Sequence, residues 1–212
     1  EPESVALGDV NGDGTLDIIT ANTGSGSVSV LIGNTDGTFQ IPIQTSVPVS
    51  GSTAFPFFSI VTDDVNGDGN DDIVVAGSSS NQVSVLASDG SGMFVSPVTY
   101  DVSFGPEDLI LGDVNGDNIR DIVTANGSSN NVSVLTGNVD GTFNAKQDFA
   151  AGDGPFSVVP GDVNGDNIVD IVTANRSSDS VSVLTGNGDG TFNSPVTYDV
   201  GTSPEAVSLG DT

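Results

Sequence analysis

Hydrophobic and polar residues alternate over short segments along the whole chain. The segment SVSVL at residues 27–31 is the clearest example, because Val28 and Val30 are separated by serines. A period of two residues is typical of a β-strand with one buried face and one polar face. No segment has a helical period of useful length. The pattern therefore predicts an all-β protein.

An acidic motif, DVNGD, recurs at a nearly fixed interval. It begins at residues 9, 64, 113 and 162, and Asp211 begins a fifth copy, so the intervals are 55, 49, 49 and 49 residues. A phenylalanine follows 30 residues after each of the first four leading aspartates; these are Phe39, Phe94, Phe143 and Phe192. A period of this size indicates a solenoid or a propeller. We expect one repeat domain over 1–212, with repeats at about 1–54, 55–103, 104–152 and 153–201 and a fifth starting at 202–212.

Each repeat contains about four predicted strands. In the first repeat, SVALGD precedes the acidic motif, DIITAN follows it, and SVSVL comes next. The last and weaker strand is clearest in SPVTYDV at 96–102 and 194–200. Antiparallel units of four strands and about 40–50 residues are the blades of a β-propeller. A β-solenoid is the alternative, but four strands are too many for one rung. We predict four four-stranded blades plus the first strand of a fifth.

The acidic motif has the donor pattern of a cation-binding loop. In the third copy, Asp113, Asn115, Asp117 and Asp121 occupy positions 1, 3, 5 and 9, and position 7 can add a backbone carbonyl. Hard oxygen donors in a flexible loop suit Ca²⁺ better than Mg²⁺, which demands stricter octahedral geometry. Position 6 is glycine in two copies and asparagine in two, and both residue types tolerate the positive φ that a tight turn needs.

Two other structures are compatible with parts of the motif. A helical EF-hand needs a glutamate at position 12 and flanking helices. Position 12 is instead Thr20, Val75, Thr124 or Thr173, and the flanking segments are predicted strands. The other alternative is a set of Asp/Asn/Gly turns with no metal. The repetition of the same donors in four copies favours the metal.

The charge of the chain narrows the possible partners. There are 29 acidic and 3 basic residues, so the formal net charge is −26. Such a surface repels nucleic acid and anionic membranes and destabilises its own compact state unless a cation neutralises part of it. No apolar run reaches the roughly 20 residues of a membrane helix, so no membrane insertion is expected. The chain has no cysteine or histidine, which excludes disulfides, thiolate or imidazole zinc sites and His-dependent triads.

The acidic loop, followed by DI(I/V)xxAN, VSVLxGN and DGTF, resembles the FG-GAP or VCBS-type repeat of integrin α-subunit head propellers and many bacterial extracellular proteins. The resemblance covers essentially the whole chain. It implies an extracellular protein whose calcium loops join the first and second strands of each blade, with about four Ca²⁺. No Phe-Gly…Gly-Ala-Pro pattern repeats, and Phe104-Gly105 occurs once, so integrin-like ligand recognition is not implied.

The resemblance also assigns ligands by position. The side-chain ligands it implies are Asp9, Asn11, Asp13, Asp17, Asp64, Asn66, Asp68, Asp72, Asp113, Asn115, Asp117, Asp121, Asp162, Asn164, Asp166 and Asp170. The backbone-carbonyl ligands it implies are Thr15, Asn70, Ile119 and Ile168.

Catalysis has little support in the sequence. Twelve of the acidic residues belong to the metal loops, and the only basic residues are Arg120, Lys146 and Arg176. No acid or nucleophile stands apart from the repeat, so we expect no enzyme. The expected function is structural or adhesive, with a protein or glycan as ligand. The alternative is the propeller part, catalytic or not, of a polysaccharide-degrading enzyme, because related propellers occur in such enzymes.

Three further features carry predictions. The recurring phenylalanine of DGTF is expected in the blade core rather than stacked on a sugar, and the cluster at residues 55–58 is either a contact patch or core. Asn126, Asn131 and Asn175 match the pattern for N-linked glycosylation. The segments 2–9 and 204–211 are the same strand of the repeat, which predicts association with further blades or with head-to-tail copies of the chain.

Overall fold

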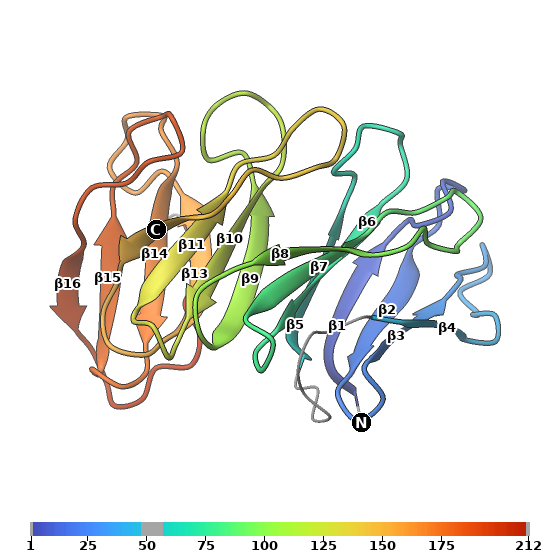
Figure 1. The fold of residues 1–212 in the computed structure, drawn as a ribbon, viewed down its shortest axis with the longest axis horizontal. Helices are drawn as coiled ribbons and strands as arrows, with labels where there is room; N and C mark the ends of the chain where they lie inside the picture. Colours follow the sequence, from blue (N-terminus) through green and yellow to red (C-terminus); the bar gives the residue numbers. More distant parts are fainter. Residues whose placement is uncertain (1, 48–56, 211–212) are drawn as a thin grey trace. The chain divides into compact units, whose positions relative to one another are not determined.

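The structure is a computed structural model that describes residues 2–47 and 57–210. Every regular element in these ranges is a β-strand, and sixteen strands form four antiparallel sheets of four strands each (Figure 1). In each sheet the strands follow one another in chain order. These sheets confirm the prediction of an all-β chain with four complete blades.

Each blade is named by its place in the chain. Blade 1 contains β1 (Pro2–Gly8), β2 (Asp17–Asn22), β3 (Ser27–Leu31) and β4 (Ile43–Ser46). Blade 2 contains β5 (Phe57–Asp63), β6 (Asp72–Gly77), β7 (Gln82–Leu86) and β8 (Val98–Asp101). Blade 3 contains β9 (Pro106–Gly112), β10 (Asp121–Asn126), β11 (Asn131–Leu135) and β12 (Gln147–Ala150). Blade 4 contains β13 (Pro155–Gly161), β14 (Asp170–Asn175), β15 (Ser180–Leu184) and β16 (Val196–Asp199).

The chain divides into two compact units. Unit 1 holds blades 1 and 2 and comprises Glu1–Asp101 with Val139–Thr142. Unit 2 holds blades 3 and 4 and comprises Val102–Asn138 with Phe143–Thr212. Each unit therefore contains one junction between two successive blades.

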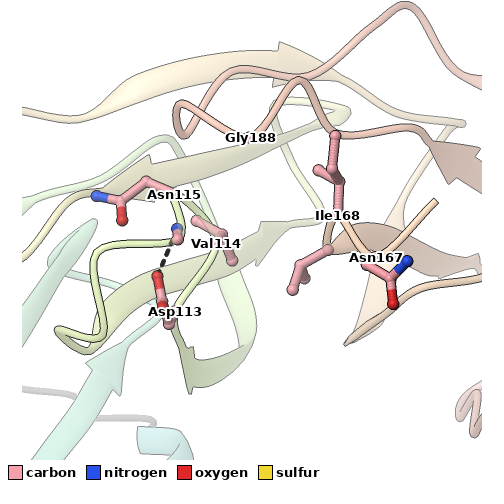
Figure 2. Close-up of a pocket in the computed structure, with 8 residues that line it drawn as sticks. Asp113, Val114, Asn115, Asn167, Ile168 and Gly188 are labelled. Atoms are coloured by element: carbon pink, nitrogen blue, oxygen red, sulfur yellow. Dashed lines mark hydrogen bonds between the residues drawn. The ribbon is translucent and has the colours of Figure 1, made fainter.

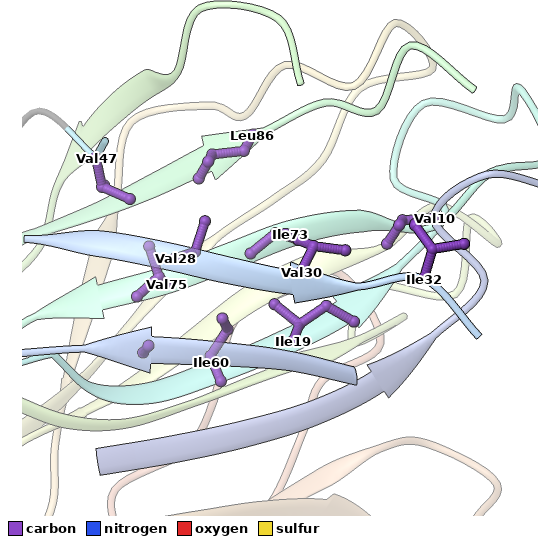
Figure 3. Packing of buried hydrophobic residues seen from close by; sticks show 11 residues of the cluster. Val10, Ile19, Val28, Val30, Ile32, Val47, Ile60, Ile73, Val75 and Leu86 are labelled. Atoms are coloured by element: carbon purple, nitrogen blue, oxygen red, sulfur yellow. The ribbon is translucent and has the colours of Figure 1, made fainter. Parts of the chain in front are cut away.

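The core of unit 1 lies between its two sheets. Ile19, Val28 and Val30 of blade 1 are buried against Ile73 and Leu86 of blade 2 (Figure 3). These residues come from opposite faces of equivalent sheets, because β-strand side chains alternate between faces. We call the face that carries Val28 and Val30, and its equivalents, the forward face. The opposite face, which carries Ile73 and Leu86 in blade 2, is the rear face.

Unit 2 repeats this packing with equivalent residues. The forward face of blade 3 presents Val132 and Val134, and the rear face of blade 4 presents Val158, Ile171 and Leu184 to the same cluster. All five side chains are at most 1% exposed. The alternation that predicts the strands therefore also fixes which side chains reach the next blade.

The recurring phenylalanine confirms its predicted place in the core in part of the chain only. Phe143 and Phe192 are each 7% exposed, and Phe94 packs against the core of unit 1. Phe39 is 43% exposed, although its motif is the same. Phe55 and Pro56 of the 55–58 cluster lie outside the described residues, so the prediction for that cluster is not tested there.

The predicted first strand of a fifth repeat is not formed as a strand. Residues 201–210 belong to no sheet, since a strand needs a neighbour for its hydrogen bonds and the described residues offer it none. The segment still lies beside β13, because a methyl group added to Gly161 would be 2.5 Å from Cδ1 of Leu209. Among the described residues, no helix has the length and hydropathy to cross a membrane.

Candidate metal-binding loops

The four acidic motifs occupy the connections that the resemblance implies. Residues 9–16, 64–71, 113–120 and 162–169 join the first and second strands of blades 1 to 4. Strand pairing continues to the last residue on each side; for example, Gly112 pairs with Asp121. Each motif is therefore a tight loop held at both ends by an antiparallel ladder.

The loop of blade 3 shows how its backbone accommodates the charges. Asp113 accepts hydrogen bonds from the backbone N–H groups of Gly116 (2.7 Å, to Oδ1) and Asn118 (2.8 Å, to Oδ2). Asp117 accepts one from the N–H of Ile119 (2.8 Å, to Oδ1). Asn115 Oδ1 accepts the N–H of Asp117 (2.9 Å), and its Nδ2 donates to Asp117 Oδ2 (2.9 Å). Backbone donors therefore face the alternating acidic side chains, which lowers the cost of placing them close together.

The other three loops repeat these contacts. The leading aspartate accepts the position-6 N–H at 2.7 Å in Asp9, 2.9 Å in Asp64 and 2.8 Å in Asp162. Position 6 has a positive φ in every copy: Gly14 at 81°, Gly69 at 88°, Asn118 at 65° and Asn167 at 65°. The prediction that asparagine supports this conformation as glycine does is confirmed.

Position 6 gives a modest stability prediction. Asn118→Ala should destabilise the protein by about 1–2 kcal/mol, because a residue with Cβ and no local hydrogen-bonding group disfavours the left-handed region. Asn118→Gly should stay within about 0.5 kcal/mol of the wild type. Urea unfolding with a chelator present measures both without any contribution from metal. Equal stability of the two variants would contradict this account.

The aspartate at position 9 has a second role that sequence reasoning missed. Asp121 is fully buried and accepts hydrogen bonds from the N–H groups of Val114 (2.9 Å, to Oδ2) and Gly137 (2.8 Å, to Oδ1). It therefore ties the start of the acidic loop to the chain after β11. The same two bonds form at the other three positions, Asp17, Asp72 and Asp170.

Burial perturbs these position-9 carboxyl groups. Desolvation raises the pKa of Asp17, Asp72 and Asp121, and for Asp72 to about 6, while the backbone hydrogen bonds oppose the rise. The other aspartates of each loop raise the pKa further, since they are like charges. At the exposed position 5 of the first loop, the hydrogen bond from Asn11 lowers the pKa of Asp13. The first loop thus combines a buried carboxyl group whose pKa is raised with an exposed one whose pKa is lowered.

The donors fit a hard cation in type and spacing. Within the described residues, no three acidic side chains are grouped as a metal centre, because the position-9 carboxylate turns toward the backbone and the others accept loop N–H groups. A carboxylate oxygen has a second lone pair, so these hydrogen bonds leave acceptor capacity on each loop. Calcium binding by the loops stays a prediction.

Within unit 2, two neighbouring acidic loops border one hollow. Asp113 and Asn115 of blade 3 lie on one side, and Asn167, Ile168 and Gly188 of blade 4 lie on the other (Figure 2). The hollow has a volume of about 370 Å³ and mixes amide and carboxylate groups with aliphatic side chains. A surface of this kind suits a small polar ligand with an apolar side.

Two of the three glycosylation motifs have no accessible amide. Asn126 and Asn175 are fully buried, and their Nδ2 atoms donate to Ser133 Oγ (2.9 Å) and Ser182 Oγ (2.8 Å). The folded blades therefore leave no room for a glycan at either residue. Asn131 is half-buried, and its Nδ2 donates to Ser103 Oγ at 3.2 Å. These asparagines are structural members of polar hydrogen-bond networks inside blades 3 and 4.

Two of the basic residues serve surface contacts. Lys146 pairs with Asp148 on β12. The guanidinium of Arg176 lies 5.1 Å from the centre of the Phe156 ring, and its Nη2 is 3.3 Å from Oε1 of Glu205. Neither contact resembles an acid–base or nucleophile arrangement.

The repeats match known families along most of the chain. Residues 64–124, 113–173 and 162–212 each match the FG-GAP-like repeat, and residues 2–31 match the FG-GAP repeat. No curated protein is significantly similar in sequence to the chain.

Solved structures with the same fold include proteins of different function. An Agrocybe aegerita lectin, described as specifically recognising non-reducing terminal N-acetylglucosamine, has a TM-score of 0.60 and 24% identity over 90% of this chain and 50% of its own. A Lactobacillus plantarum protein has a TM-score of 0.67 and 18% identity over 93% of this chain and 57% of its own. The dihydro-heme d1 dehydrogenase NirN has a TM-score of 0.62 and 16% identity over 94% of this chain and 38% of its own. These likenesses show a β-propeller-type fold alone, and the chain spans only about half the length of the first two proteins.

Proposed function

Because the chain belongs to the FG-GAP-like repeat family, we propose that it is a calcium-stabilised β-propeller module with a structural or adhesive role outside the cell. The observation that carries the calcium proposal is the fourfold acidic loop. Each copy places Asp and Asn at positions 1 and 3, which are half-buried in three copies and exposed in the fourth, an exposed Asp at position 5 and a buried Asp at position 9. Nothing cationic in the chain balances these groups in number, since three basic residues face 29 acidic ones.

In this proposal, the ions stabilise the fold and take no part in chemistry. The donors in blade 3 would be Asp113, Asn115, Asp117 and Asp121 with the carbonyl of Ile119, and the other loops would use the equivalent residues. Four Ca²⁺ would change the formal net charge from −26 to about −18. Each ion would add a link between the loop and the two strands that flank it.

The proposed ligand is a protein or a glycan bound at the loop surface. The hollow beside Asp113 and Asn167 supports a glycan, because amide and carboxylate groups there lie next to Val114 and Ile168. The fold is also that of a lectin, although the likeness to that lectin extends to half of its length. The second candidate is a propeller part of a polysaccharide-degrading enzyme, and it is favoured only by the presence of enzymes among proteins of this fold.

Calcium stoichiometry gives a direct test of the loops. Isothermal titration of the metal-free protein should show about four Ca²⁺ per chain, and Asp117→Ala should remove one, because the exposed position-5 carboxylate of one loop is lost. Thr142→Ala, outside the four acidic loops, is the matched control and should keep the wild-type number. A stoichiometry unchanged by Asp117→Ala would contradict the assignment of that loop.

Two further measurements distinguish a glycan-binding module from an enzyme. The calcium-loaded protein should bind a subset of the glycans on an array. The substitution Ile168→Ala should reduce that binding, because the side chain of Ile168 borders the hollow while only its backbone carbonyl is a proposed Ca²⁺ ligand. Incubation with polysaccharides should release no new reducing ends. Release that disappears on changing one acid outside the acidic loops, with stability intact, would establish the enzyme instead.

A further inference from the structure

Two blade faces that are apolar are uncovered in the described structure. On the rear face of blade 1, Val5 is 64% exposed, whereas its equivalents Ile60 and Val158 are 4% and 1% exposed. On the forward face of blade 4, Tyr198 is 55% exposed and Val196 is 54% exposed. Neighbouring exposed apolar side chains on one face can form a contact site.

The junction inside unit 2 shows what covers such faces. Phe192 of blade 4 packs edge-on against Phe149 on β12 of blade 3, with ring centres 5.4 Å apart and an interplanar angle of 76°. By the repeat of 49 residues, Tyr198 is the blade 4 equivalent of Phe149. Phe39 is the blade 1 equivalent of Phe192 and is 43% exposed against 7% for Phe192. The two uncovered faces therefore carry the two halves of the same aromatic contact.

The segment 204–210 marks the position that a following blade takes. Thr62 Oγ1 of β5 donates to the carbonyl of Leu7 on β1 (2.8 Å), so successive first strands lie side by side. Leu209 is the equivalent of Thr62 one repeat after β13. A methyl group added to Gly8 of β1 would be 2.8 Å from Thr62 Oγ1, and one added to Gly161 of β13 would be 2.5 Å from Leu209 Cδ1, so the two side chains lie over equivalent glycines. The forward side of blade 4 thus already accepts the first-strand sequence of this repeat, although this segment forms no ladder there.

Charge is complementary at the rim of this face. Arg176, at the end of β14, lies against Glu205 of the segment 204–210 with 3.3 Å between Nη2 and Oε1. Glu3 on β1 is the residue of blade 1 that corresponds to Glu205, since the sequences PES and PEA align there. A blade 1 placed on blade 4 would therefore bring a carboxylate to one of the three basic residues of the chain.

We propose that blade 1 of a second copy of this chain docks head-to-tail on the forward face of blade 4. Val5 of the second copy then packs against blade 4 as Val158 of blade 4 packs against blade 3, and Phe39 of the second copy packs on Tyr198. Glu3 replaces Glu205 beside Arg176, and the incoming β1 displaces the segment 204–210, which has no strand ladder to lose. The contact is heterologous, so it continues into a ring or a filament. This inference deepens the proposed structural role by naming the partner, and it does not require that the loops bind Ca²⁺.

The test is sedimentation of the full chain over a wide concentration range. It is done with Ca²⁺ and, separately, with a chelator in 0.5 M salt, where screening reduces repulsion between chains of charge −26. Association should rise with concentration. Phe39→Asp and Tyr198→Asp should each weaken it by about tenfold or more, because a charge enters the apolar contact. Val139→Asp is the control, because Val139 is 79% exposed and lies in the connection between β11 and β12 of blade 3; this substitution should leave the association unchanged.

Mixing the two variants tests the head-to-tail geometry. A Phe39→Asp chain keeps an intact blade 4 face, and a Tyr198→Asp chain keeps an intact blade 1 face, so the mixture should form dimers and stop there. A wild-type chain that stays monomeric at every concentration would overturn the proposal. A second result would also overturn it: the chain is a monomer, and Phe39→Asp and Tyr198→Asp lower its melting temperature by similar large amounts. That result would mean that the two faces pack together within one chain. Calcium titration of the same samples is independent of these outcomes and reports on the loops alone.

Discussion

Removal of Ca²⁺ with a chelator is expected to lower the melting temperature of the protein by about 20 °C or more. A ligand that binds only the folded state adds about 2.7 kcal/mol per site at a hundredfold excess over its Kd. For a chain of this size, about 1 kcal/mol corresponds to roughly 2–4 °C. Four loops that bind Ca²⁺ would therefore account for a shift of this size.

The physical reason is the imbalance of charge within each loop. In blade 2, burial and the neighbouring Asp64 and Asp68 raise the pKa of Asp72 to about 6, so the ionised form of this carboxyl group is disfavoured in the folded protein. A cation at the loop would offset that like-charge repulsion directly. The melting curve should recover with added Ca²⁺ and recover poorly with Mg²⁺, whose smaller octahedral shell fits a flexible loop less well.

Monovalent salt is the control for this experiment. Concentrated sodium chloride screens the overall charge of −26 but does not coordinate to a particular loop. If sodium chloride restores the melting temperature as well as micromolar Ca²⁺ does, the effect is general screening. A melting temperature that does not change after thorough chelation would remove the calcium proposal altogether.

The number and content of the blades could be predicted because they depend on local patterns. The alternation around Val28 and Val30 predicts the strand, and the interval between acidic motifs predicts the repeat. The positive φ at Asn118 could be predicted as well, since it depends on the chemistry of one tight turn. Each of these features is decided within about 50 residues of sequence.

Other features depend on contacts between distant residues and could not be predicted. Phe39 and Phe192 have the same motif, yet they are 43% and 7% exposed, because only Phe192 has a preceding blade to pack against in the described structure. Residues 204–210 are a second example, because their sequence is similar to that of β1 but the described residues contain no strand that pairs with them. Local sequence predicts the tendency to form a strand, and the neighbour decides whether the strand forms.

The double role of the position-9 aspartate was also beyond sequence reasoning. Asp121 reaches Gly137, sixteen residues later, only because the register of β10 and β11 brings that N–H group to it. The pairing of Ile122 with Leu135 fixes that register. The signal in the sequence was the invariable placement of this aspartate directly before an apolar strand, where a buried carboxylate needs backbone partners.

Asp121→Ala is the second large prediction, and it concerns the metal-free protein. The substitution leaves the buried N–H groups of Val114 and Gly137 without their acceptor, at about 1–3 kcal/mol for each group. The free energy of unfolding should fall by about 2–6 kcal/mol in urea with a chelator present. Asp117→Ala is the matched control, because its hydrogen bonds are exposed and water can replace them. Asp117→Ala should lower the free energy of unfolding by no more than about 1 kcal/mol under the same conditions.

The comparison of these two variants separates structural support from metal binding. With Ca²⁺ present, both should lose the contribution of the third loop; without it, only Asp121→Ala should remain strongly destabilised. If Asp121→Ala and Asp117→Ala lower the free energy of unfolding by equally small amounts in the presence of chelator, the two buried hydrogen bonds of Asp121 contribute little to stability. Because Asp121 lies in unit 2, hydrogen exchange should show protection lost first in 102–138, while β2 and β3 of unit 1 keep theirs. Asp17→Ala should reverse that order, because the same pair of bonds then fails at Val10 and Gly33 in unit 1.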